Sequence, residues 1–298
     1  MTTPNLKKAD FEVVSLKRNP TSPRTLFGLI MSGIAGLFTL IAIVPLFIIL
    51  TYLLTRGISA LSLSVFTELP PPPMVEGGGF GNAILGTVIM VGIGALISVP
   101  LGIMAAIYLS EFQEGKASDW IRFATNVLSG VPSIIVGVFA YSAVVLTTKS
   151  YSAWAGGFAL SILMLPIIVR TTDESLKLVP QDVRQASVGV GANRYQTVLQ
   201  VVLPAALPAI ITGITLAIAR AAGETAPLLF TALFTQFWPN WDNLLVEPTA
   251  SLSVLVYNFA IVPFKNQQEL AWGAAFILVL LVLVTSIISR LATAKRTY

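Results

Sequence analysis

The stretch that decides the fold runs from Arg170 to Pro204 and reads RTTDESLKLVPQDVRQASVGVGANRYQTVLQVVLP. It is polar, whereas the sequence on either side of it is apolar over lengths typical of membrane spans. A polar segment between two spans has to lie in water. We therefore expect an all-α membrane protein in which residues 171–204 form a large polar loop.

Two short helices joined by a glycine are expected within this loop. Pro180 suits a first helical turn, and Gly191 is the expected stop, because a residue without Cβ reaches positive φ at little cost. Asn193 is the expected N-cap of the second helix, which we expect to run to Pro204. Both helices have a small or apolar face that no lipid covers, so a partner protein is the simplest recipient. The side chains that recur with helical spacing on these faces are Val183, Ala186, Ser187, Val190, Tyr195, Val198, Leu199 and Val202.

The composition is that of a membrane protein and argues against an enzyme. The chain of 298 residues is 55% hydrophobic and 11% charged, against roughly 25% charged residues in a soluble domain. It contains no cysteine and no histidine, which removes thiolate chemistry and the commonest acid–base catalyst and metal ligand. It also lacks the G-x-x-x-x-G-K-[ST] pattern of a phosphate-cradling loop. We therefore expect no catalytic residue, no metal site and no cofactor.

Six apolar runs are expected to cross the membrane as helices, and the first three are longer than the roughly 20 residues that a bilayer requires. Residues 1–24 are polar and lack the apolar core and cleavage site of a signal peptide, so we expect a retained tail. Residues 25–295 then form one six-span domain. The expected spans are residues 26–54, 83–109, 123–146, 154–169, 205–222 and 271–289.

The distribution of positive charge predicts the orientation of the spans. An even number of spans places both termini on one side of the membrane. Of the 18 lysines and arginines, Arg56, Lys149 and Lys265 fall in the expected outer segments and Arg220 falls within a span, whereas the others fall on the side of the termini. By the positive-inside rule, both termini and the polar loop are cytoplasmic, and residues 56–81 and 225–270 are periplasmic. Because the cations follow the membrane topology, their excess does not indicate nucleic acid.

Arg220 and Glu224 are the charged residues expected in the outer half of the fifth span and around its end. They are four residues apart, so they share a helix face and can form an ion pair. A charge at the bilayer centre costs at least about 2.5–3.5 kcal/mol, so such residues usually face a bundle interior or a translocation path. Two interpretations stay open: a pair that only orients helices, and a site on the path of a solute.

Arg170, at the cytoplasmic end of the fourth span, also has two interpretations. It either receives an anion at the exit of a path or extends its side chain to lipid phosphates.

The polar loop resembles the "EAA" loop of ABC-importer permeases, which reads E-A-A, three residues, Gly, nine residues and I-x-L-P. The spacing is kept, while Gln185 replaces the usual Glu, so the ion pair which that carboxylate would make with an ATPase is in question. In that family the loop docks in a groove of the ATPase subunit, and the alternative is an ordinary connector. The matching residues, and therefore the expected coupling residues, are Gln185, Ala186, Ser187, Gly191, Leu203 and Pro204.

Three further stretches resemble one family, the permeases of the bacterial phosphate-specific ABC importer, of the PstA type. They are R-A-A-G-E-T-A-P from Arg220, L-P-I-I-V-R-T-T-D-E-S-L-K-L-V-P from Leu165, and E-G-G-G-F-G-N-A-I-L-G-T from Glu76. The resemblance implies a type I ABC importer permease fold in the bacterial inner membrane. It also implies a heterodimer with a second homologous permease, an ATPase subunit dimer that hydrolyses the ATP, and a periplasmic or lipid-anchored phosphate-binding protein.

From this resemblance we hypothesise that Arg220, Glu224 and the adjacent Thr225 form a site that phosphate occupies during translocation. Arg170 would then lie at the exit. A guanidinium matches the geometry of a phosphate oxyanion, and a carboxylate can accept the proton that hydrogen phosphate carries and sulfate lacks. A permease for another oxyanion (phosphonate, sulfate or molybdate) is the alternative. An anion channel or secondary carrier would not need a docking loop, and no internal repeat supports a carrier.

Overall fold

A computed structural model describes residues 22–112, 115–243 and 246–294, and these residues contain helices and no strand. The expected tail of residues 1–24 lies almost wholly outside the described residues. The chain divides into two units, residues 1–52 and 53–298, and each is described by itself. An all-α fold is thereby confirmed for the described residues.

The first unit contributes most of α1 (Pro23–Ser59), the first expected span. Every side chain from residue 29 to residue 52 is exposed, and most of them are large and apolar. Such a helix is apolar on all sides, which is typical of a helix that contacts lipid or another apolar chain.

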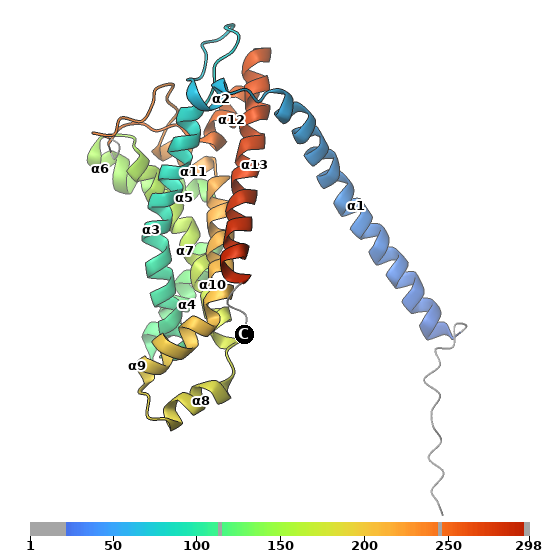
Figure 1. The fold of residues 1–298 in the computed structure, drawn as a ribbon, viewed down its shortest axis with the longest axis vertical. Helices are drawn as coiled ribbons and strands as arrows, with labels where there is room; N and C mark the ends of the chain where they lie inside the picture. Colours follow the sequence, from blue (N-terminus) through green and yellow to red (C-terminus); the bar gives the residue numbers. More distant parts are fainter. Residues whose placement is uncertain (1–21, 113–114, 244–245, 295–298) are drawn as a thin grey trace, which may run out of the picture. The chain divides into compact units, whose positions relative to one another are not determined.

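The second unit is built on four long helices that run side by side: α3 (Gly81–Glu111), α7 (Ala153–Lys177), α10 (Leu203–Ala222) and α13 (Lys265–Ala294) (Figure 1). α3 and α7 form the most extensive helix pair, and α10 packs on the other side of α7. The buried core between them includes Met90, Leu160, Met164, Ile168, Ala217 and Leu228.

Glycines allow α3 and α7 to approach closely. A Cβ added to Gly157 of α7 would lie 2.5 Å from Ile93 Cβ of α3, and one added to Gly102 of α3 would lie 2.7 Å from Ile168 Cγ2 of α7. In a membrane, where apolar side chains gain little by leaving lipid, helices associate through such close packing.

Short helices close the two ends of this bundle (Figure 1). One end carries α8 (Gln181–Gly189) and α9 (Arg194–Thr197) and is called the α8 end below. The opposite end carries α2 (Ser64–Thr67), α11 (Ala226–Thr231) and α12 (Leu252–Ala260) and is called the α11 end.

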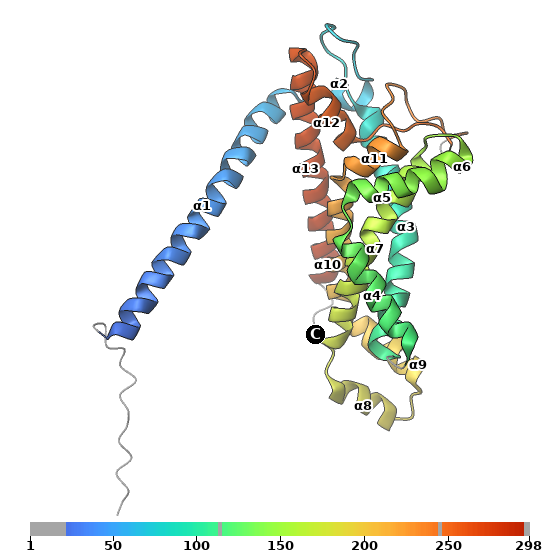
Figure 2. The same cartoon turned by 180° about the vertical axis from the view of Figure 1, so that it is seen from behind.

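The third expected span is not one continuous helix. The chain forms α4 (Lys116–Gly130), then α5 (Ser133–Ala140), which continues through a π-helical turn (Tyr141–Val145) into α6 (Leu146–Thr148). The two parts are bent by 107° (Figure 2). Pro132 is the cause, because the residue before a proline is driven out of the helical region, and Val131 is accordingly extended.

Within the residues that the structure describes, five helices are long and apolar enough to cross a membrane, and the count reaches six when the bent pair is one span. This confirms the expected polytopic membrane fold but corrects the geometry of residues 123–146.

The fourth span also differs from expectation, because α7 runs to Lys177 instead of ending near residue 169. Residues 171–177, expected in the polar loop, continue the helix. Two ion pairs with helical spacing support this extension: Arg170 Nε lies 3.1 Å from Glu174 Oε1, and Lys177 Nζ lies 2.5 Å from Asp173 Oδ2.

The fifth span begins earlier than expected, because Pro204 does not end the second loop helix. α9 continues into a π-helical turn, η2 (Val198–Val202), and directly into α10. Proline disturbs a helix because its ring collides with the preceding turn. Here the wider π-helical turn comes just before Pro204, so the helix continues past it.

We predict that Gly157→Leu destabilises the second unit, because its Cβ would collide with Ile93 Cβ and lie 3.1 Å from the Met90 carbonyl oxygen. Overpacking of this kind costs about 1–3 kcal/mol. Gly92→Leu is the matched control, since a Cβ at Gly92 meets nothing within 4 Å. The thermal midpoint of each purified variant in detergent measures the effect, and equal midpoints would contradict the close-packing argument.

Candidate functional site

Arg220 and Glu224 form the expected ion pair at the end of α10. Arg220 Nε lies 3.5 Å from Glu224 Oε1. α10 ends at Ala222, so the pair spans the last helical turn and the turn that follows it. The Arg220 side chain is 61% exposed and the Glu224 side chain 15%. The carboxylate is thus held against the protein, while most of the Arg220 side chain stays accessible.

Neighbouring helices fix the turn that holds Glu224. Its N–H donates to the Ala221 carbonyl, and its own carbonyl accepts a 2.8 Å hydrogen bond from Ser253 Oγ of α12. The Thr225 carbonyl accepts from Leu228 N–H, at the start of α11. Sequence reasoning did not identify Ser253, because nothing in the local pattern places α12 beside the end of α10.

Arg170 lies far along the bundle from this pair, toward the α8 end. α7 leads into α8 shortly after Arg170, whereas α10 leads into α11 shortly after Arg220 (Figure 1). Arg170 pairs with Glu174, and both side chains are exposed. The two residues line an open cavity of about 300 Å³ together with Arg122, Asn126 and Asp173. The structure therefore does not bring Arg170 and Arg220 into one site.

The wall of this cavity contains a charged cluster that the sequence did not predict. Asp173 is buried, and its Oδ2 atom lies 2.5 Å from Lys177 Nζ and 3.3 Å from Arg122 NH1 of α4. Arg122 also donates to the Leu109 carbonyl of α3 at 3.0 Å. These contacts tie α4, the first helix of the bent pair, to α3 and α7.

The two expected features of the polar loop are confirmed. Gly191 has φ +94°, so it ends α8 in a conformation that favours glycine. Asn193 caps α9 by accepting a 2.9 Å hydrogen bond from Gln196 N–H, and the Gln196 side chain accepts one from Asn193 N–H at 2.8 Å. This reciprocal capping box fixes where α9 begins.

The expected coupling residues differ in exposure. Gln185, Ala186, Gly191 and Pro204 are exposed, Leu203 is half-buried, and Ser187 is buried, with its hydroxyl 3.0 Å from Thr197 Oγ1.

The apolar face of the loop is covered only in part by its own chain. Val198 and Val202 are buried in the bundle, whereas Val190 is 88% exposed and Tyr195 68%. These two apolar side chains are therefore left uncovered by this chain.

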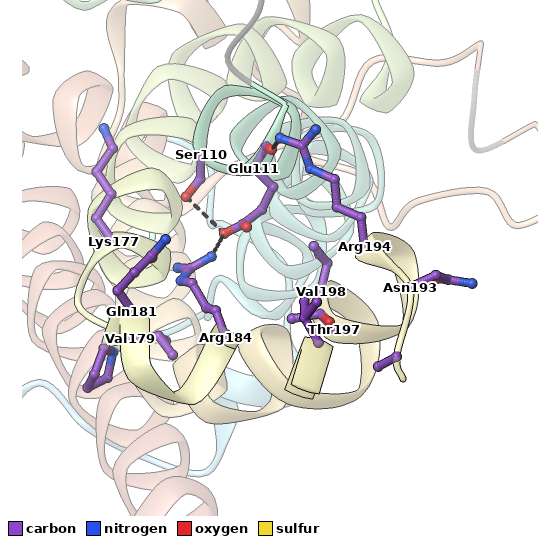
Figure 3. Close-up of a pocket in the computed structure, with 13 residues that line it drawn as sticks. Ser110, Glu111, Lys177, Val179, Gln181, Arg184, Asn193, Arg194, Thr197 and Val198 are labelled. Atoms are coloured by element: carbon purple, nitrogen blue, oxygen red, sulfur yellow. Dashed lines mark hydrogen bonds and ion pairs between the residues drawn. The ribbon is translucent and has the colours of Figure 1, made fainter. Parts of the chain in front are cut away.

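A cavity of about 890 Å³ lies between α8, α9 and the end of α3 (Figure 3). The ion pair between Arg184 of α8 and Glu111, the last residue of α3, lines this cavity. Arg184 NH2 also donates to the Leu176 carbonyl of α7 at 2.7 Å. The sequence did not predict this contact, because the two residues are 73 positions apart in the chain.

Arg194 adds a second tie between the loop and α3. Its guanidinium donates to the Glu111 carbonyl and lies 4.7 Å from the centroid of the Phe112 ring. The Phe112 ring also packs on the Tyr195 ring, with 5.4 Å between the centroids.

Within the described residues, no group of three or more acidic, histidine or cysteine side chains is arranged to hold a metal ion.

Apolar helices of membrane length, a bent pair and an exposed polar loop make up a fold that is also found in ABC transporters. Solved structures share this fold. The MetNI methionine ABC transporter covers 73% of this chain and 94% of its own matched chain with a TM-score of 0.56 at 19% identity. The bacterial alginate ABC transporter covers 91% and 96% with a TM-score of 0.60 at 12% identity.

Sequence relatives make the assignment narrower. Residues 98–297 match the family model of the binding-protein-dependent transport system inner membrane component. The phosphate transport system permease protein PstA of Yersinia pestis is 42% identical over 81% of either chain. That of Haemophilus influenzae is 42% identical over 88% of this chain and 92% of its own. PstA 1 of Mycobacterium tuberculosis is 35% identical over 92% of either chain. The chain belongs to the PstA family of phosphate transport permeases.

We predict that Gly191→Val loosens the loop, because a β-branched residue at φ +94° is strained although the space around it is open. A left-handed conformation costs about 1–2 kcal/mol, which raises the ratio of the loosened to the intact loop by roughly 5–30-fold. Gly189→Val is the control, since Gly189 lies within α8 and a Cβ there also meets nothing within 4 Å. The rate of trypsin cleavage after Arg184 and Arg194 should rise for Gly191→Val alone, and equal rates would contradict this explanation.

Proposed function

We propose that this chain is the membrane-spanning, non-catalytic permease subunit of an ATP-driven importer that moves inorganic phosphate across the bacterial inner membrane. The observation that carries the proposal is the identity of 42% with a phosphate transport permease over 88% of this chain. A partner subunit hydrolyses the ATP. The expected single domain of residues 25–295 serves as the permease domain.

The charge distribution supports an orientation with the α8 end in the cytoplasm. Arg122, Lys177, Arg184 and Arg194 all lie near that end, as the positive-inside rule requires. Both termini are then cytoplasmic, and the α11 end is periplasmic, where a phosphate-binding protein would deliver its cargo.

The Arg220–Glu224 pair is the proposed transient phosphate site on the periplasmic half of the path. The exposed guanidinium offers paired N–H donors to phosphate oxygens. Glu224 accepts the proton of hydrogen phosphate or partly neutralises Arg220, so that the anion binds weakly enough to leave. Thr225 supplies a hydroxyl beside the pair. A second permease subunit would close the open side of the site.

Arg170 is the proposed exit residue. It faces the open cavity beside α4, where Glu174 shares its charge. An anion that leaves through this cavity meets a guanidinium already paired with a carboxylate, which limits how long it is held.

The polar loop is the proposed dock for the ATPase dimer. Gln185, Ala186 and Gly191 lie on its exposed surface, beside the uncovered Val190 and Tyr195. A groove in the ATPase would bury these apolar groups. Gln185 carries no charge, so its contact with the ATPase would be a neutral hydrogen bond in place of an ion pair. Leu203 and Pro204 join the dock to α10, the helix that ends in Arg220.

We predict that Arg220→Gln lowers phosphate uptake by at least about tenfold, because hydrogen bonds to a charged group contribute about 1.5–3 kcal/mol each. Arg220→Lys keeps the charge but loses the planar pair of donors, so its uptake should be intermediate. The assay uses proteoliposomes with the assembled transporter, internal ATP, external binding protein and labelled phosphate, with sulfate as the competitor.

Three results would each contradict a different part of this proposal. Normal uptake by Arg220→Lys would show that charge alone suffices. ATP-dependent uptake of another oxyanion would reject phosphate as the substrate but keep the permease. Uptake without any ATPase would reject the ATP-driven mechanism.

We predict that Ala186→Arg uncouples ATP hydrolysis from uptake, because a long charged side chain would not fit a groove that receives an exposed alanine. Ala117→Arg is the control, since Ala117 is also exposed and lies on α4, outside the loop. Phosphate uptake and ATP hydrolysis are measured on the same proteoliposomes. Normal uptake by Ala186→Arg would remove the loop from the docking surface.

A further inference from the structure

Glu111 is a nearly buried carboxylate for which the proposed transport path has no use. Its side chain is 9% exposed, and it lies at the last residue of α3. Its Oε1 atom accepts a hydrogen bond from Ser110 Oγ at 3.2 Å and forms the ion pair with Arg184. Burying a charge is costly unless it is paired, so the position of Glu111 depends on Arg184.

Arg184 connects three helices at one point. It lies on α8, immediately before Gln185, and its side chain is 15% exposed. One amino group contacts the Glu111 carboxylate of α3, and the other donates to the Leu176 carbonyl of α7. Figure 3 shows the Arg184 side chain pointing from α8 toward Glu111.

These contacts lead from the loop to the two most closely packed helices. α3 and α7 interlock through glycines, so they resist sliding past one another. α10 packs on α7, where a Cβ on Gly213 would collide with Thr171. A displacement of α8 that pulls on Glu111 and Leu176 therefore acts on the helices that position Arg220.

We propose that Glu111 is a positioning residue, paired with Arg184, that transmits the movement of α8 to α3 and α7 and so couples ATP hydrolysis to transport. The inference rests on the proposed function, because it assumes that an ATPase moves α8. Glu111 touches neither the substrate path nor the exposed face of the loop.

The nearly buried ion pair suits this task better than an apolar contact would. An apolar contact does not fix which two atoms stay together, whereas separating a buried charge pair leaves both charges unpaired. The pair therefore makes α8 and α3 move together. Arg194, which donates to the Glu111 carbonyl, holds the start of α9 to the same residue.

The test measures phosphate uptake and ATP hydrolysis in the reconstituted transporter, with and without the binding protein. Glu111→Gln keeps the shape of the side chain but removes its charge. We expect the phosphate moved per ATP to fall by about fivefold or more, the lower end of typical coupling between two sites. Asp119→Asn is the control, because it removes an exposed carboxylate on α4 near the same end of the bundle.

A charge exchange separates a coupling role from a merely structural one. Glu111→Arg and Arg184→Glu should each lower the amount of phosphate moved per ATP hydrolysed, and the double variant should recover part of this ratio. Size-exclusion chromatography reports whether each variant still assembles. If the pair were only structural, the variants would yield less assembled transporter, but the transporter that does assemble would move the normal amount of phosphate per ATP.

The outcomes distinguish the two proposals. An unchanged ratio in Glu111→Gln, in a transporter whose wild type moves phosphate, overturns the role of Glu111 and leaves the proposed function intact. A wild type that moves no phosphate overturns the proposed function itself. A low ratio in both single variants with no recovery in the double variant also overturns the pairing of Glu111 with Arg184.

Discussion

The close contact between α3 and α7 is the constraint on which the rest of the second unit depends. Helices in lipid gain little by hiding apolar side chains from one another, so their positions are set by packing geometry. Gly157 and Gly102 remove the side chains that would keep the two backbones apart. Once this pair is fixed, α10 docks on α7 with Gly213 against Thr171, and the end of α10 places Arg220 and Glu224 beside α12. The location of the candidate site thus follows from glycines remote from it.

The features that the sequence predicted correctly are local ones. The pairing of Arg220 with Glu224 needs only a spacing of four residues, and the cap at Asn193 needs only Gln196 three residues later. Gly191 adopts positive φ because the chain must turn between two helices, and glycine is the residue that does so at least cost. In each case the interacting groups are neighbours in the chain, so a sequence pattern contains the whole interaction.

The features that the sequence did not predict depend on distant residues or on a competition between two local rules. Glu111 and Arg184 are 73 positions apart, and no local pattern joins them. Ser253 reaches Glu224 across the fold in the same way. Residues 123–146 are apolar enough to predict one continuous span, yet Pro132 prevents a straight helix and bends the chain by 107°. At the end of α7 polarity favoured a loop, but ion pairs at helical spacing kept residues 171–177 helical.

Two connections lead from the polar loop into the bundle, a covalent one into α10, which carries Arg220, and a side-chain one to α3 and α7. The covalent route runs from α9 through η2 into α10, and η2 is a π-helical turn followed by Pro204. π-helical turns are rare and are frequent at functional sites, and a helix is least regular where it contains one. Under the proposed function, a movement of the loop along this route would be spread over the turn before it reaches α10. The second route runs through Arg184 to Glu111 and Leu176, and it ends on the interlocked α3 and α7 without crossing an irregular turn. Under the proposed function, a loop that moves the far end of the bundle acts more directly through the Arg184 side chain than through its own backbone.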